Sequence, residues 1–176
     1  MVSSSESLVA FYKQLGFFNR VDAKTVVERF VDERGDEPDL DNPWHDVFLL
    51  RLSDGVWSGD PERDVCAENA VYEDLISQFA DISKGSFAAE SITESWDTDT
   101  GPIKVSFQLK GKPVSISPKY RNDWFDLDVL KQINALISPS GRQFECAADG
   151  NFALVLCLTP DVKQRMENER NFPFAW

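Results

Sequence analysis

Asp60, Glu62 and Asp64 are three carboxylates at alternate positions and have the clearest potential for metal chemistry in this chain. Carboxylate oxygens are the ligands that Mg²⁺ prefers, so one alternative is a metal-assisted hydrolase built on these residues. Carboxylates in a loop after a glycine, here Gly59, more often face solvent or cap the next helix. We therefore expect a solvated acidic loop with no bound metal.

A second form of the enzyme alternative uses His45, the single histidine, with one of three cysteines, Cys66, Cys146 and Cys157. A Cys66–His45 pair brought together by folding would make a thiol enzyme. No Gly-x-Ser-x-Gly elbow accompanies the histidine, and the cysteines have no Cys-x-x-Cys spacing. The sequence therefore predicts reduced, buried thiols and no catalytic residue.

Other motifs are incomplete. Asp97 to Gly101 begins like a calcium loop, but the sixth and twelfth positions are Pro102 and Gln108 in place of glycine and a carboxylate. No phosphate-binding loop, dinucleotide motif or thiolate zinc spacing occurs, so we expect no cofactor. The pair Trp124-Phe125 follows a short basic segment and could stack on RNA, but the net charge of −12 opposes this, and a packed aromatic pair is expected.

The acidic residues are distributed unevenly. Residues 1–100 contain 22 Asp and Glu against 8 Lys and Arg, a net charge of −14, whereas residues 101–176 contain 8 against 10, a net charge of +2. The segment 32–64 is the densest. A field of this sign repels nucleic acid and anionic membranes, and it accelerates encounter with a basic protein. We therefore expect a protein partner that is basic, and neither nucleic acid nor a membrane.

Periodicity predicts an α+β fold. Helices are expected near 4–15, 22–34, 44–52 and 71–82, although 47–57 could instead form a hairpin. After Gly85 the period changes to two: strands are expected at 103–109 and 114–116, with another near 92–96, and Asp149-Gly150 joins two more. Helices are expected from about residue 126 and after Pro160. The prediction is N-terminal helices, about 1–85, followed at 86–176 by an antiparallel sheet of four to five strands with helices on one face, in a single domain.

Composition agrees with a folded protein in a reducing compartment. The chain has 176 residues, of which 42% are apolar, and includes 13 Phe and 5 Trp. The longest apolar run, 152–158, is far short of the ~18 residues that a membrane span requires. The first residues do not resemble a cleaved signal. We expect a cytoplasmic protein, with a monomer favoured.

Residues 85–165 contain a series of local patterns. They are the strand 103–109 and its Lys110-Gly111 turn, Asn122-Asp123-Trp124-Phe125-Asp126, Val129-Leu130, Ile133-Asn134, Arg142-x-Phe144, Asp149-Gly150 and Leu154 to Thr159. Together they resemble a family of small bacterial immunity proteins. Such proteins protect cells from polymorphic toxins and from contact-dependent growth inhibition. The resemblance implies a cytoplasmic, non-catalytic protein that binds the C-terminal domain of a cognate toxin, often a nuclease. It carries no binding residues over to this chain.

Because the resemblance names no binding residues, the predicted binding surface is chosen from the distribution of charge. A nuclease presents Lys and Arg to phosphates, which an acidic inhibitor can contact. Trp44 and Trp57 are candidate aromatic anchors beside the carboxylates. The predicted toxin-binding residues are Asp36, Glu37, Asp39, Asp41, Trp44, Asp46, Asp54, Trp57, Asp60, Glu62 and Asp64. An acidic nucleic-acid mimic that blocks a DNA-binding protein remains a further alternative.

Overall fold

The computed structural model describes residues 2–175, which form α-helices and two antiparallel sheets. The helices are α1 (Ser5–Gln14), α2 (Ala23–Arg34), α3 (Pro43–Leu50), α4 (Val71–Ile82), α5 (Val129–Ile137) and α6 (Pro160–Arg170), with a short 3-10 turn at Ser138–Ser140. The strands are β1 (Val56–Gly59), β2 (Ala89–Trp96), β3 (Ile103–Leu109), β4 (Lys112–Ile116), β5 (Gln143–Asp149) and β6 (Phe152–Leu158). The predicted α+β class is confirmed.

The strands do not form one sheet of four to five strands, as the sequence suggested. They divide into two three-stranded sheets with the orders β1-β6-β5 and β2-β3-β4. The division arises because β6 has two partners: β5 through the hairpin at Gly150, and β1, whose Trp57 lies opposite Val155. The predicted hairpin of β3 and β4 is present, and β3 also pairs with β2. These three strands form the second sheet, separate from β5 and β6.

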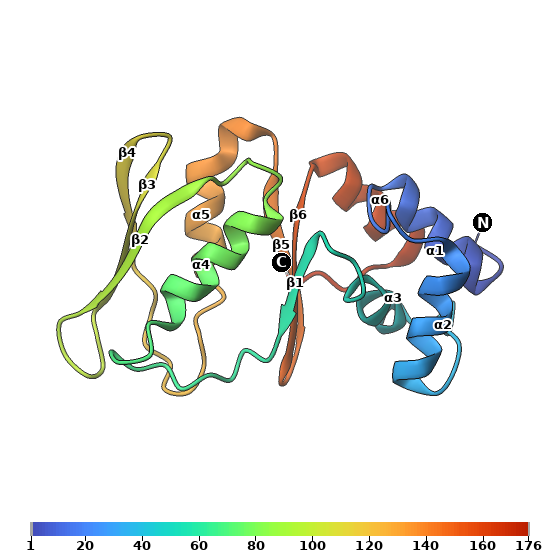
Figure 1. Ribbon diagram of the computed structural model, residues 1–176, viewed down its shortest axis with the longest axis horizontal. Coiled ribbons are helices and arrows are strands. Elements are labelled where there is room, and N and C mark those ends of the chain that lie inside the picture. Colours follow the sequence, from blue (N-terminus) through green and yellow to red (C-terminus); the bar gives the residue numbers. More distant parts are fainter. Residues whose placement is uncertain (1, 176) are drawn as a thin grey trace.

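The first sheet lies at the centre of the molecule, with helices on both faces (Figure 1). Successive side chains of β6 point to opposite faces of the sheet, and those on both faces are apolar. Both faces therefore need a covering layer. Ala153, Val155 and Cys157 join a core with α4, α5 and the second sheet. Leu154, Leu156 and Leu158 join another core with α1, α2 and α3. The expectation of helices on one face is therefore wrong for this sheet.

Local signals place most element ends where the sequence put them. Asp22 caps α2 by accepting the Thr25 N–H at 2.9 Å, and Gly35 ends that helix with φ of 88°. Thr159 precedes α6, whose first residue is Pro160. The ambiguous segment folds as helix α3 followed by strand β1. Helix α1 begins with a capping box formed by Ser4 and Ser7.

None of the helices described is both long enough and apolar enough to cross a membrane.

Candidate protein-binding surface

The predicted binding residues do not form one continuous surface. Asp36, Glu37, Asp39 and Asp41 lie in the loop between α2 and α3, on the helical side of the central sheet. Asp60, Glu62 and Asp64 follow β1, in a segment that contacts residues 123–125 through Pro61 and Arg63 and Asn151 through Glu62. Asp54 is exposed in the turn before β1. The acidic region of the sequence is therefore two acidic segments, 36–41 and 60–64, in different settings.

Asp46 is not part of either exposed segment, because its side chain is fully buried. Arg170 donates from Nε at 2.8 Å and from Nη2 at 2.9 Å to the two carboxylate oxygens, and the Tyr12 hydroxyl donates at 2.5 Å. Burial, followed by the nearby Asp46 charge, holds the pKa of Tyr12 well above its usual value. Asp46 thus joins α3 to α1 and α6 and is unavailable to a partner in this structure.

Trp57 is also buried, with 5% of its surface exposed. Its ring packs edge-on against Phe79 and Phe125, and its Nε1 donates to Gln78 Oε1 at 2.6 Å. Trp44 is half-buried and packs against Phe48, with 6.5 Å between ring centroids. The role of surface anchor that the sequence suggested for Trp57 therefore does not fit its position in the core.

The segment 36–41 is partly held by internal hydrogen bonds. Glu37 accepts from the Ser5 hydroxyl at 2.6 Å, and the Asp39 carboxylate accepts from the Asp41 N–H at 3.0 Å. His45 Nδ1 accepts the Asp39 N–H at 2.8 Å, and its ring lies 5.7 Å from Phe30. His45 therefore helps to order the acidic loop by binding its backbone at Asp39.

Cys66 lies in another part of the molecule. The neighbouring Val65 packs in the core formed with α4 and α5, whereas the Phe30 that contacts His45 belongs to the core on the opposite side of the sheet. The fold therefore places the two residues of the thiol-enzyme alternative in different layers. Burial raises the pKa of Cys146 to about 12 and also raises that of Cys157, which makes both thiols poor nucleophiles.

The carboxylates of segment 60–64 each have a local partner. Asp60 accepts the Glu62 N–H at 2.8 Å, and Asp64 accepts from Asn69 Nδ2 at 2.8 Å. Glu62 accepts from Asn151 Nδ2 at 3.4 Å. Over residues 2–175, no three His, Cys, Asp or Glu side chains gather in a group that could hold a metal ion. Asp60, Glu62 and Asp64 are therefore not gathered as the ligands of one metal ion.

Trp124 lies directly beside this acidic segment. Glu62 and Trp124 form an isolated antiparallel bridge, and the Phe125 N–H donates to the Pro61 carbonyl at 3.1 Å. Among the described residues, Trp124 is an exposed large hydrophobic side chain, with 37% of its surface accessible, whereas Phe125 is buried. The two rings are therefore not the packed pair expected from the sequence: one faces the core and the other faces solvent.

A hollow of about 470 Å³ adjoins Trp124. Pro61, Leu127 and Ala148 give it apolar walls, Asp128 contributes a carboxylate, and Arg121 contributes a guanidinium that is paired with Asp126 and Asp128. Asp123 and Asp149 are exposed and are chain neighbours of the lining residues Trp124 and Gly150. We call Trp124, this hollow, and the nearby carboxylates of Glu62, Asp123 and Asp149 the Trp124 surface. Sequence reasoning missed it because residues distant in the chain form it.

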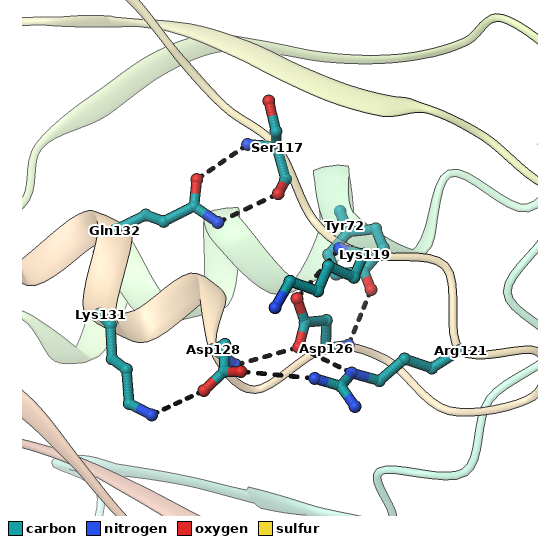
Figure 2. A network of polar contacts seen from close by, with 8 residues as sticks. All are labelled: Tyr72, Ser117, Lys119, Arg121, Asp126, Asp128, Lys131 and Gln132. Carbon is teal, nitrogen blue, oxygen red and sulfur yellow. Dashed lines mark hydrogen bonds and ion pairs between the residues drawn. The ribbon is translucent and has the colours of Figure 1, made fainter.

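The loop that presents Trp124 is fixed by a buried carboxylate (Figure 2). Asp126 is 1% exposed and accepts from the Lys119 N–H at 3.0 Å and from Arg121 Nε at 2.9 Å. The Asp126 N–H donates to the Tyr72 hydroxyl at 2.7 Å, and burial raises the pKa of that tyrosine. These contacts tie the loop of residues 119–126 together and attach it to α4.

Asp128 extends the same network toward solvent. Lys131 Nζ donates to its carboxylate at 2.7 Å, and Arg121 Nη2 does so at 3.3 Å, as Figure 2 shows. The hydrogen bond from Lys131 is the largest cause of a lowered pKa at Asp128, and the charge of Arg121 adds to it. Asp128 is therefore ionised at neutral pH.

Comparisons with known proteins add no assignment: the chain matches no family model, no curated protein and no solved structure. The resemblance to immunity proteins stays a prediction.

Proposed function

We propose that this chain is a non-catalytic immunity protein that binds and neutralises a basic toxin domain, a nuclease, in the cytoplasm. The observation that carries the proposal is the concentration of negative charge in residues 1–100, a net of −14, part of which is exposed in segments 36–41 and 60–64. The family resemblance over residues 85–165 supports the same class of function.

The electrostatics of such a pair favour fast binding. An acidic surface that faces a phosphate-binding surface steers the encounter and raises the association rate to about 10⁸–10⁹ M⁻¹ s⁻¹ at low salt. Speed is useful against a toxin that acts catalytically. Electrostatic steering also predicts that binding weakens as the salt concentration increases, because charges are screened over about 10 Å at 0.1 M salt.

The direct test has two stages. The tagged protein is cross-linked lightly in its source cells, and the proteins recovered are identified by mass spectrometry and retested for binding at low and high salt. The basic domain recovered is then produced with and without this chain, and nuclease activity and cell growth are measured. We expect stoichiometric, salt-sensitive inhibition of the nuclease and restored growth.

Two results would contradict the proposal. A recovered domain that keeps full activity in the complex would exclude neutralisation. Recovery of a repressor or restriction enzyme that is released from DNA would favour the nucleic-acid mimic. A calorimetric titration with Mg²⁺, Mn²⁺ and Zn²⁺ addresses the hydrolase alternative, which requires a specific heat of binding.

A further inference from the structure

We propose that the Trp124 surface is the anchor point of the interface and that it receives an arginine side chain of the basic partner. This inference rests on the proposed function, because it assigns the partner's contact to one of the two exposed acidic segments, 60–64, and its surroundings. It also replaces Trp57, which is buried, with Trp124, which is exposed.

The exposed ring is the first reason. Tryptophan and arginine are enriched among the residues that dominate binding energy, and a guanidinium stacks well on an indole face. Within the described chain, the cations that lie over aromatic rings contact Phe11, Phe17, Phe48 and Phe174. Arg121, the cation nearest in sequence to Trp124, is bonded to Asp126 and Asp128. Arg121 lines the hollow beside Trp124 but is held by these two ion pairs, so the exposed part of the Trp124 ring can receive the guanidinium of a partner.

The shape and charge of the hollow are the second reason. An arginine has an apolar stem and a charged, planar end. The stem matches the apolar walls of Pro61, Leu127 and Ala148. The charged end matches the exposed carboxylates of Glu62, Asp123 and Asp149 beside the hollow, since the charge of Arg121, which lines the hollow, is already paired with Asp126 and Asp128. A lysine would match the charge but would stack less well on the ring.

The fixed loop is the third reason. The Asp126 network and the backbone pairing of Glu62 with Trp124 hold the backbone that carries the ring before any partner arrives. A loop whose backbone is already ordered loses less conformational entropy on binding. The segment 36–41 offers carboxylates, but its neighbouring aromatic, Trp44, is half-buried against Phe48.

The test uses the full chain labelled with 5-fluorotryptophan and observed by ¹⁹F NMR. The five tryptophans give separate signals, which single Trp→Phe variants assign. The probe is the peptide Gly-Arg-Gly-Arg-Gly amide, with citrulline and lysine versions as controls. We expect the Trp124 signal to move several times more than the others, strongly with arginine, less with lysine and not with citrulline.

Matched charge reversals then locate the site. Glu62→Lys, Asp123→Lys and Asp149→Lys together should weaken peptide binding about tenfold, whereas Asp32→Lys, Asp36→Lys and Asp41→Lys should weaken it less than about threefold. Both triple variants change the net charge by the same amount. A difference in peptide affinity between them therefore reports the location of the charges and not the overall field. Melting curves check that each variant folds.

The inference is overturned if the ¹⁹F signal of Trp124 does not shift at about 10 mM peptide. Any dissociation constant would then be weaker than that of weak specific binding. The inference is also overturned if the two triple variants lose affinity equally. Its failure is separable from that of the proposed function: neutralisation of a toxin that is lost on reversal of residues 32, 36 and 41, but kept in Trp124→Ala, would retain the function and move the anchor.

Discussion

Asn134 on α5 closes the edge of strand β5 by pairing with both backbone polar groups of Phe144. Its Nδ2 donates to the Phe144 carbonyl at 2.8 Å, and its Oδ1 accepts the Phe144 N–H at 2.6 Å. The side-chain amide thus replaces a neighbouring strand at a sheet edge. Gln132 does the same for Ser117, just beyond β4, at 2.9 and 3.1 Å. Helix α5 therefore links both sheets.

The change Asn134→Ala should destabilise the protein by about 2–3 kcal/mol, because two partly buried backbone groups lose their partner. Urea denaturation measures the loss. The matched control is Gln132→Ala, which removes the same pair of bonds at an exposed site and should cost about 0.5–1 kcal/mol. Equal losses would mean that burial of the β5 edge does not set the effect.

The change Arg170→Met should cost about 3–5 kcal/mol, because it leaves the fully buried Asp46 carboxylate without its cation. Tyr12→Phe keeps the ion pair and should cost about 1–2 kcal/mol. Lys24→Met breaks an exposed pair with Glu28 and should cost no more than about 0.5 kcal/mol. Thermal and urea unfolding provide the values.

The double variant Asp46→Leu/Arg170→Met separates the two contributions. Removing both charges leaves no buried carboxylate to solvate, so the double variant should be more stable than Arg170→Met alone. A double variant that is less stable than both single variants would instead assign the stability to the ion pair itself.

The sequence predicted elements better than it predicted their partners. Helical spacing placed α4, and alternation placed β3, because each pattern is read within one short segment. The apolar run Phe152–Leu158 is a strand buried on both faces, and the helices that cover it include α4 on one face and α1, α2 and α3 on the other, all distant in the sequence. The division into two sheets depends on the pairing of β1 with β6, which no local pattern in the sequence indicates.

The two tryptophans illustrate the same limit at the candidate site. Trp57 and Trp124 both have acidic neighbours in sequence, yet one is buried and the other exposed. The position of Trp57 is set by its register opposite Val155, and that of Trp124 by a bridge to Glu62. Both pairings are long-range, so local composition could indicate an acidic surface but could not locate its anchor.

Native-state thiol labelling should distinguish Cys66 from the two other cysteines. Cys66 is half-buried in a loop, whereas Cys146 and Cys157 are buried and have raised pKa values. With an excess of an aromatic disulfide reagent at pH 8, one thiol should react quickly and the other two only after unfolding. The variant Cys66→Ser should lose the fast phase. Fast reaction of that variant would contradict the buried positions of the two strand cysteines.

The pH dependence of stability should show opposite signs for Glu145 and Asp22. Burial is the main cause of the raised pKa of Glu145, despite a hydrogen bond from Lys163 at 2.8 Å. Its folded form holds a proton more tightly than its unfolded form. That contribution to stability is complete below the ordinary pKa of 4.5 and is lost as pH rises toward the folded value.

The comparison is the free energy of unfolding of the wild type minus that of Glu145→Gln, measured by urea titration from pH 4 to 7. This difference should fall as pH rises. For Asp22, hydrogen bonds from Thr25 lower the pKa below 3.8, so stability is gained above that value and lost in acid. The difference for Asp22→Asn should therefore rise between pH 2.5 and 5. A difference for Glu145→Gln that also rises would show that Lys163 outweighs burial and that the carboxylate prefers its charged form.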